Sequence, residues 1–282
     1  MLNLAIDSQA ADWGGFSWST WIPLGAPASA FRILPAIAGF YRVRAVNRSG
    51  LVYVGQTGRS LRERTRALAV HAYRSADSPP WNDPHTAAPG LWAYRLEEDL
   101  DYEISVTPSE RDYPERQSKE DELLFRHRVA HESSTLCNHG RFHPLWDRPS
   151  NRAGRRAMQR RSDSDPNPAG GPSLTPVQLR GHPIDEDWLG LSWSPTRPLA
   201  AMEAPNVPGV YRLISDGAVV YLGESKSLRG RLRTHAQHRS DTLGSYVRMP
   251  GALDHHLAER ECDLIGAHNL AHGPPAAQWS AR

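Results

Sequence analysis

Two sets of side chains in this sequence have the types and the order needed for phosphate chemistry. Each set has two tyrosines in neighbouring apolar runs, an arginine early in the next basic segment, and a glutamate farther on. The sets are Tyr41, Tyr53, Arg64 and Glu122 in the first half, and Tyr211, Tyr221, Arg231 and Glu261 in the second. Glutamate is a hard oxygen ligand that suits Mg²⁺, with water and substrate phosphate completing the shell. Arginine matches phosphate oxygens, and a tyrosine hydroxyl orients or deprotonates water. The sets therefore indicate metal-assisted phosphodiester hydrolysis.

The same predicted elements position the side chains of both sets. Alternating apolar and polar residues predict a strand over 40–46, and a turn at 47–50 joins it to a second strand over 51–54. Ser60 is placed to cap a helix over 61–73, followed by a strand over 102–106 and a helix over 117–131. The second half repeats this order with strands over 209–214, 219–222 and 245–249 and helices over 228–237 and 253–268. The prediction is an α+β tandem repeat of a small three-stranded antiparallel sheet flanked by helices.

The repeated motif resembles the signature of the GIY-YIG nuclease family. Gly39-Phe40-Tyr41 with Tyr53-Val54-Gly55 is similar to that signature, and Gly209-Val210-Tyr211 with Tyr221-Leu222-Gly223 is similar to a second copy. The resemblance covers about residues 36–140 and 206–279. It implies a domain with a three-stranded sheet flanked by helices. It also implies that this domain cuts nucleic acid with one divalent metal ion. The family includes homing endonucleases, restriction enzymes and the incision subunit of nucleotide excision repair.

The resemblance also implies a role for each matched residue. Its active-site tyrosines match Tyr41, Tyr53, Tyr211 and Tyr221, its helical arginine matches Arg64 and Arg231, and its metal-binding glutamate matches Glu122 and Glu261. The asparagine that closes the domain matches Asn138, which is also a common turn former. A histidine near the attacking water matches His235. Both copies depart from the full pattern, because Leu68 stands at the histidine position of the first and the second has Gln278 near the place of the asparagine.

The composition predicts two domains and a linker. Residues 1–143 form the first domain, with a Trp-rich lead-in that recurs at Trp188 and Trp193, and residues 177–282 form the second. The tryptophans are interpreted as packing anchors, with base stacking as the alternative. Residues 144–176 are rich in Arg, Ser, Pro and Gly and predict a mobile linker. Its arginines form either a solvated tether or a nucleic-acid contact.

Net charge, cysteine content and the length of apolar runs limit the classes of protein to which this chain can belong. The 282 residues carry a formal net charge of +2, so overall charge does not predict a nucleic-acid partner. Two cysteines give neither a zinc spacing nor a disulfide framework, which favours a reducing compartment. The first residues lack a signal-peptide pattern, and no apolar run has the length of a membrane helix. The expectation is a cytoplasmic protein without membrane contact.

The predicted function is an endonuclease that cuts DNA with Mg²⁺ or Mn²⁺, RNA remaining an open alternative as substrate. Two sites in one chain would allow a monomer, or a weak dimer, to cut both strands of a duplex. The alternative function is a nucleic-acid-binding protein in which one or both nuclease sites are degenerate. Which copy cuts, and in what biological role, is left open by the sequence.

Overall fold

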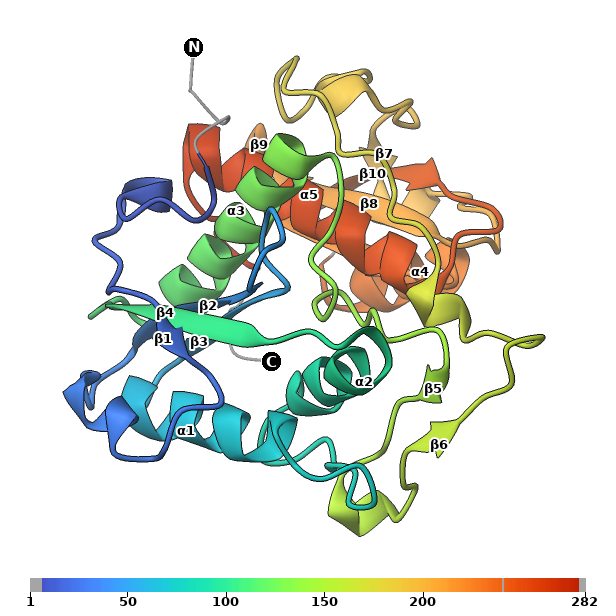
Figure 1. Ribbon diagram of the computed structural model, residues 1–282. Helices are drawn as coiled ribbons and strands as arrows, with labels where there is room; N and C mark the ends of the chain where they lie inside the picture. The colour runs from blue at the N-terminus through green and yellow to red at the C-terminus, as the bar shows by residue number, and fades with distance from the viewer. Residues whose placement is uncertain (1–6, 240, 279–282) are drawn as a thin grey trace. The chain divides into compact units, whose positions relative to one another are not determined.

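The computed structural model describes residues 7–239 and 241–278, which form two compact units (Figure 1). The first unit is Met1–Pro172 and the second is Ser173–Arg282. Each unit has its own antiparallel sheet and its own helices, so the fold is α+β with a tandem arrangement, as the sequence predicted. Among the described residues, none of the helices combines the length and the apolar character needed to cross a membrane.

The sheet of the first unit has the strand order β1-β4-β2-β3 and is antiparallel throughout. Its strands are β1 (Ile22–Pro23), β2 (Gly39–Ala45), β3 (Tyr53–Thr57) and β4 (Tyr102–Pro108). The three predicted strands are present, and the two-residue β1 is added at the edge of β4. Helices α1 (Leu61–Ala72) and α2 (Ala88–Glu98) lie below the sheet in Figure 1, and α3 (Tyr113–His131) lies above it.

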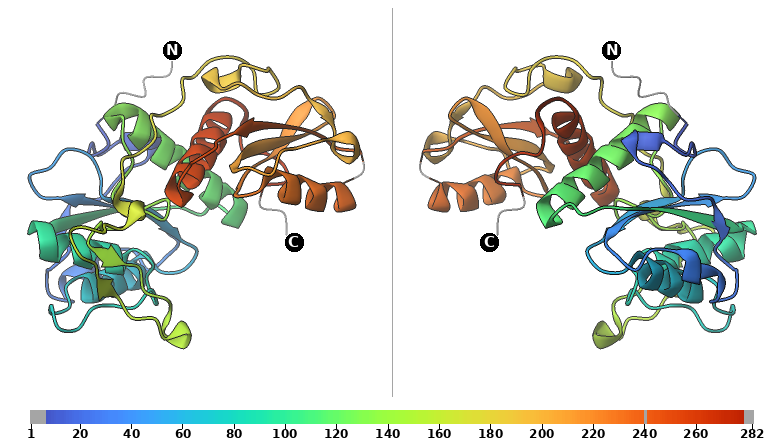
Figure 2. Two further views of the ribbon diagram at one scale, coloured as in Figure 1. Left: turned by 90° about the vertical axis from the view of Figure 1, so that its right-hand side faces the viewer. Right: turned by 90° about the vertical axis from the view of Figure 1, so that its left-hand side faces the viewer.

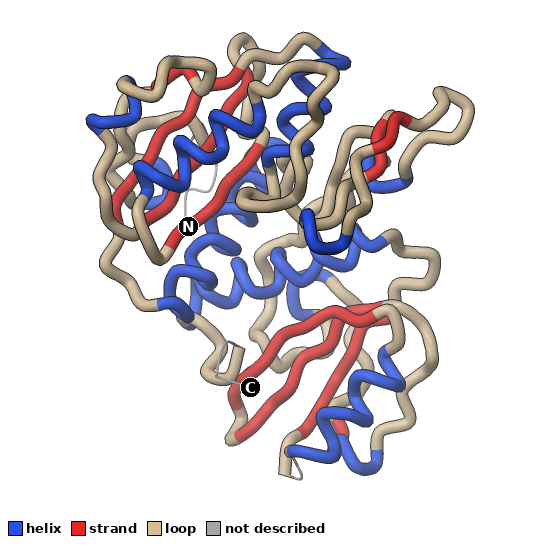
Figure 3. Tube along the Cα trace, turned by 90° about the horizontal axis from the view of Figure 1, so that it is seen from below, coloured by secondary structure: helices blue, strands red, loops and turns tan. Residues whose placement is uncertain are grey.

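The second unit repeats this topology with the strand order β7-β10-β8-β9. Its strands are β7 (Arg197–Pro198), β8 (Gly209–Ser215), β9 (Ala218–Ser225) and β10 (Leu243–Arg248), and its helices are α4 (Leu228–His238) and α5 (Asp254–His272). Helix α4 packs on the sheet face that carries Tyr211 and Leu213, while α5 contacts β8 and β9 (Figure 2 and Figure 3). Only a few residues separate α4 from β10, whereas residues 73–101 of the first unit hold a long loop and α2. This insertion explains the unequal arginine-to-glutamate spacing of the two copies.

The Trp-rich lead-in packs against the sheet in the same way in both units. The Trp18 indole donates a hydrogen bond to the Trp13 carbonyl, 2.8 Å away, and the guanidinium of Arg42 lies 4.4 Å from the Trp18 ring. In the second unit the same contacts join Trp193 to the Trp188 carbonyl at 3.1 Å, and Arg212 to the Trp193 ring at 4.3 Å. All four indoles are buried, which confirms them as packing anchors and leaves their faces out of reach of a base.

Residues 144–172, which the sequence predicted as part of a mobile linker, lie within the first compact unit. Strands β5 (Trp146–Asp147) and β6 (Gln159–Arg160) form a small hairpin within the first unit. Trp146 packs edge-on against Trp92 of α2, with ring centroids 5.0 Å apart. Residues 173–176 belong to the second unit, where the Leu174 amide donates to Glu259 of α5 at 2.8 Å. The polar composition hid a few apolar side chains that are enough to bury this segment.

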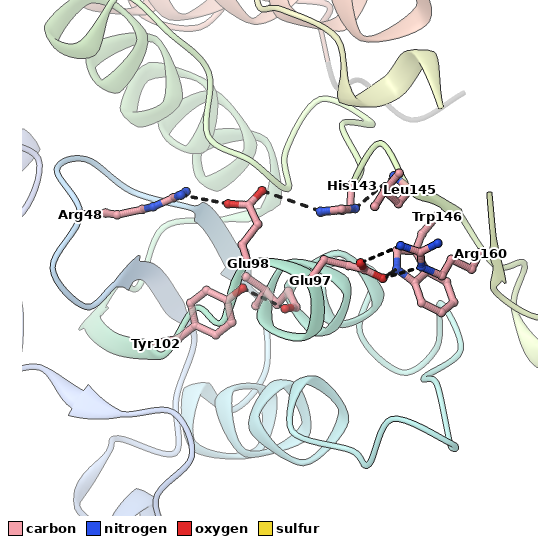
Figure 4. A network of polar contacts seen from close by, with 9 residues as sticks. Arg48, Glu97, Glu98, Tyr102, His143, Leu145, Trp146 and Arg160 are labelled. Carbon is pink, nitrogen blue, oxygen red and sulfur yellow. Dashed lines mark hydrogen bonds and ion pairs between the residues drawn. The ribbon is translucent and has the colours of Figure 1, made fainter. Parts of the chain in front are cut away.

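The hairpin is also tied to α2 by charge. Glu97 accepts hydrogen bonds from the Trp146 indole at 2.8 Å and from Arg160 at 3.0 and 3.1 Å (Figure 4). The Arg160 hydrogen bond holds the pKa of the Glu97 carboxyl below its ordinary value. Next to it, Glu98 accepts from Arg48 at 2.9 Å and faces His143 at 3.7 Å. Arg160 of the predicted tether therefore contributes to the packing of the first unit.

Replacing Trp146 with alanine tests whether this segment belongs to the folded unit. Loss of a packed indole from a buried position costs about 3 kcal/mol. We expect the unfolding transition of the first unit, followed by circular dichroism in urea, to lose about that amount in Trp146→Ala. The matched control is Arg155→Ala in the same segment, where the side chain is exposed and the change is expected to stay within about 0.5 kcal/mol. Equal stabilities of the two variants would contradict the packed arrangement.

Candidate active sites

The repeated glycines allow the first tyrosine of each motif to lie across its neighbouring strand. In the register of β2 and β3, Tyr41 stands opposite Gly55. A β-carbon at Gly55 would lie 2.6 Å from the Tyr41 hydroxyl oxygen and 2.7 Å from the Tyr53 ring. At Gly223 it would lie 2.5 Å from the hydroxyl oxygen of Tyr211, which stands opposite that glycine on β8. Because no side chain fits there, each glycine keeps open the space in which the tyrosines lie.

The two tyrosines of each motif form a pair on one face of the sheet, the face that packs against α1 in the first unit and α4 in the second. The ring centroids of Tyr41 and Tyr53 are 5.9 Å apart, and those of Tyr211 and Tyr221 are 6.0 Å apart. Tyr41 and Tyr211 are fully buried, while Tyr221 is partly exposed. Burial raises the pKa of the Tyr41 hydroxyl above its ordinary value, although Arg64 opposes the shift. Tyr41 therefore carries its proton at neutral pH.

An arginine from the following helix donates to the first tyrosine in both units. The helices begin where their caps predict, because Ser60 and Ser227 each accept a hydrogen bond from a first-turn amide at 3.2 Å. This start places Arg64 and Arg231 on the face of the helix next to the tyrosines. The Nε atom of Arg64 lies 3.4 Å from the Tyr41 hydroxyl, and that of Arg231 lies 3.0 Å from the Tyr211 hydroxyl.

A histidine completes the contacts of each tyrosine hydroxyl, but the two histidines come from different elements. His235 extends from α4 one turn after Arg231, and its Nε2 atom lies 3.0 Å from the Tyr211 hydroxyl. The corresponding residue of α1, Leu68, is buried in the core. In its place, His85 from the loop before α2 puts Nε2 at 2.9 Å from the Tyr41 hydroxyl. Sequence reasoning missed His85 because nothing in its spacing relates it to the motif.

The glutamate next to the tyrosines of the first unit is Glu120. Its charge acts on both Tyr41 and Tyr53, and it interacts in turn with Arg64. Loss of solvation raises the pKa of the Glu120 carboxyl to about 8, and the positive charge of Arg64 limits the rise. A carboxyl with such a pKa is largely protonated at neutral pH until a cation approaches it.

The structure places Glu122, the predicted metal ligand, in a different environment. Its carboxylate lies 2.7 Å from Nζ of Lys119 and 2.8 Å from Nε of Arg126, and the side chain is 4% exposed. Successive residues of an α-helix are rotated by about 100°, so side chains two positions apart point to nearly opposite sides. The register of α3 thus turns Glu120 toward the tyrosines and Glu122 into a salt-bridge network. Glu122 is replaced by Glu120 in the site described below.

In the second unit the predicted glutamate, Glu261, lies where Glu120 lies in the first. Its carboxylate interacts with Arg231 and accepts a hydrogen bond from the backbone amide of Glu224, the residue after Gly223. Loss of solvation, with a further contribution from the nearby Glu224 carboxylate, raises the pKa of Glu261 to about 7. Both units therefore bring one partly buried, pKa-raised glutamate to the arginine that contacts the first tyrosine.

Asn138 holds the edge strand of the first unit. Its side-chain oxygen accepts from the Val54 amide at 2.9 Å, and its side-chain nitrogen donates to the Val54 carbonyl at 2.8 Å. Gln278 makes the same pair of bonds to Leu222, at 2.8 and 2.7 Å. Since Val54 and Leu222 each lie between the second tyrosine and the glycine, these amides fix the backbone of the motif. The departure from asparagine in the second copy therefore leaves the clamp in place.

A cavity of about 720 Å³ adjoins Arg64 in the first unit. It is lined by the loop after β3, the start of α1 and the start of α3, and its cationic side chains are Arg59, Arg64 and Arg116. Arg116 is held by a hydrogen bond of 3.3 Å to Gln56. Three guanidinium groups around one cavity favour an anionic ligand, and their planar donors match phosphate oxygens.

The donor set of each site fits one magnesium ion that shares its shell with a substrate. Within the described ranges, no group of three or more histidine, cysteine, aspartate or glutamate side chains is arranged to hold a metal ion. The first site instead offers Glu120 next to an arginine, and the second offers Glu261 next to an arginine with the Glu224 carboxylate nearby. Mg²⁺ is commonly bound by one or two carboxylates together with water and substrate phosphate. Glu120 and Glu261 are the residues that would hold such an ion.

Comparison with known proteins finds a local similarity. A stretch of 65 residues is 38% identical to UvrABC system protein C from Haloquadratum walsbyi (strain DSM 16790 / HBSQ001). The stretch covers 23% of this chain and 11% of that protein, so the chain matches only a small part of its length. No protein-family model matches the chain, and no solved structure matches it.

The raised pKa of Glu120 predicts a specific pH dependence of stability. Between an ordinary pKa near 4.5 and the folded value of about 8, the folded state binds the proton more tightly than the unfolded state, so stability falls as the pH rises. Glu120→Gln removes this loss. We expect the variant to gain about 2 kcal/mol relative to the parent protein between pH 5 and pH 8, less than the full shift because the carboxyl is partly exposed.

The measurement is urea unfolding at both pH values, at low salt and with EDTA. Glu122→Gln is the control, because it leaves Lys119 and Arg126 without their shared carboxylate and should lose about 2 kcal/mol at both pH values. A Glu120→Gln variant whose stability relative to the parent protein does not change with pH would contradict the description of Glu120.

Proposed function

We propose that both units are metal-dependent phosphodiesterase sites of the GIY-YIG type and that the chain is a DNA endonuclease. The observation that carries the proposal is the repetition of one side-chain arrangement on two stretches of sequence. In each unit a tyrosine hydroxyl lies between an arginine and a histidine, and a pKa-raised glutamate lies beside the arginine. The units reach this arrangement with a different source of histidine and a different arginine-to-glutamate spacing. A scaffold that had lost its function would have no need of it twice.

Two further observations support the proposal. The local similarity to UvrABC system protein C agrees with the resemblance of the motifs to the GIY-YIG family. The cavity lined by Arg59, Arg64 and Arg116 gives the first unit a cationic surface that includes the arginine of the site, and a phosphate backbone favours such a surface.

The chain's own groups divide the chemistry between them. A bound Mg²⁺ would supply positive charge at a phosphate oxygen and lower the pKa of a bound water. Glu120 and Glu261 would hold the ion, and with their raised pKa values its binding would release a proton near neutral pH. Arg64 and Arg231 stabilise the negative charge that builds on the phosphate in the transition state.

The tyrosines orient the attacking water instead of removing its proton at rest, because burial keeps their own protons in place. In the second site we assign His235 as the acceptor of the Tyr211 proton. The Tyr211 oxygen accepts from Nε of Arg231 and lies 3.0 Å from Nε2 of His235. A water that gives its proton to the Tyr211 oxygen while that hydroxyl gives its proton to His235 becomes the hydroxide that attacks phosphorus.

Cleavage of supercoiled plasmid tests the proposal. With Mg²⁺ we expect the parent protein to cut the DNA and the double variant Glu120→Gln, Glu261→Gln to be slower by at least about 100-fold, because both metal ligands are lost. Each single variant keeps one site and should accumulate nicked circles. Glu122→Gln is the matched control on α3, and its rate per folded protein should stay within about twofold of the parent rate.

Two results would reject this assignment. One is a plasmid that stays intact at every Mg²⁺ and Mn²⁺ concentration while the protein binds it in a salt-dependent manner, which describes a DNA-binding protein without activity. The other is a loss of cleavage in Glu122→Gln with none in Glu120→Gln. Faster cutting of single-stranded RNA than of DNA in the same assay would change the proposed substrate to RNA and leave the assignment of the active sites unchanged.

A further inference from the structure

The histidine of the first site is carried by the loop that is inserted between α1 and β4. His85 is fully buried, and its ring centroid lies 5.7 Å from that of Tyr41 and 5.8 Å from that of Tyr53. His235 lies 5.3 Å from both tyrosines of the second unit. The two histidines therefore occupy equivalent places against the tyrosine pair, although one belongs to a loop and the other to a helix.

The backbone after His85 decides which ring nitrogen carries the proton. The Ala87 amide donates a hydrogen bond to Nδ1 of His85, at 3.2 Å. An imidazole nitrogen that accepts a hydrogen bond has no proton of its own, so a neutral ring must carry its proton on Nε2. Burial, with the nearby charge of Arg64, keeps the pKa of His85 well below its ordinary value and the ring neutral. His85 is thus a donor to the Tyr41 oxygen 2.9 Å away.

The loop is held in place from two sides within the first unit. The guanidinium of Arg64 donates to the Pro84 carbonyl at 2.5 Å, so the arginine of the site also holds the residue before His85. The segment around the β5–β6 hairpin holds the other side, where the Arg152 amide donates to Asp83 at 2.8 Å and the Asn82 amide donates to the Ser150 carbonyl at 3.3 Å. The segment expected to be a linker thereby fixes the position of His85.

We propose that His85 is a positioning residue of the first site, where it replaces the helical histidine of the second unit and donates its Nε2 proton to the Tyr41 oxygen. With Arg64 donating to the same oxygen, Tyr41 accepts two hydrogen bonds, which leaves its own proton to be donated to a third group. His85 takes no proton from Tyr41. The two sites then differ in their chemistry, because His235 is placed to receive a proton and His85 is placed to give one.

The tautomer of His85 is tested first, by a measurement that does not depend on cleavage. In long-range ¹H–¹⁵N spectra of protein labelled at histidine, the signals of His85 are assigned by their loss in His85→Gln. We expect a neutral ring with the proton on Nε2, unchanged from pH 6 to pH 8 and shifted by Tyr41→Phe. A proton on Nδ1, or signals that do not respond to Tyr41→Phe, would overturn the proposal.

The role of His85 in cleavage is tested in a Glu261→Gln background, where only the first site cuts; this part rests on the proposed function. We expect His85→Ala to lower kcat by about 10- to 100-fold with little change in KM, because Tyr41 loses its orientation. Leu68→His added to His85→Ala rebuilds the arrangement of the second unit and should restore at least about tenfold. Val70→Ala, on the same helix as Leu68 but with an exposed side chain, is the control and should stay within about twofold.

The outcomes separate the two proposals. Unchanged kcat in a folded His85→Ala variant, or equal losses in His85→Ala and Val70→Ala, would overturn the role of His85 and leave the nuclease assignment standing. A parent protein that cuts no DNA but shows the expected tautomer would reject the nuclease assignment and leave the contact with Tyr41 standing.

Discussion

The hydroxyl of one buried tyrosine in each unit constrains where the surrounding strand, helix and histidine can lie. Tyr41 and Tyr211 each bring a polar group into a core, and burying such a group without hydrogen bonds is costly. An arginine and a histidine satisfy it in both units. The first strand of the motif, the following helix and the source of the histidine must therefore stay in register with one oxygen atom. This requirement links the fold to the proposed chemistry.

Other parts of each unit hold these elements in position around the tyrosine hydroxyl. Glycine on the neighbouring strand leaves room for the ring, and the amide clamp from Asn138 or Gln278 satisfies the outer side of the edge strand next to it. The tryptophan lead-in covers the opposite face of the first strand by stacking on Arg42 or Arg212. The first unit adds the β5–β6 hairpin, which supports the loop that supplies its histidine. The two units thus reach one geometry with different supporting parts.

The fold was more predictable from the sequence than the site. Alternation, turns and serine caps located the strands and helices, and the repeat confirmed their order, because these signals are local. Local sequence signals do not identify the glutamate of the site. Glu120 and Glu122 are two positions apart, and only the packed register of α3 shows which of them faces the tyrosines. His85 had no signal at all, since a loop residue reaches its partners through tertiary structure. The folding of residues 144–172 was missed because its few buried apolar residues are diluted by arginine, serine and proline.

We propose that each unit holds one divalent metal ion between its glutamate and a phosphate, and a crystal structure with Mn²⁺ and a short DNA duplex would locate such ions. Anomalous scattering from Mn²⁺ locates the ions without assumptions about the site. The account predicts one peak at Glu120 and one at Glu261, each beside the arginine that contacts the first tyrosine. Manganese bound at Glu122, or DNA bound at the tyrosines with no metal at either glutamate, would contradict it.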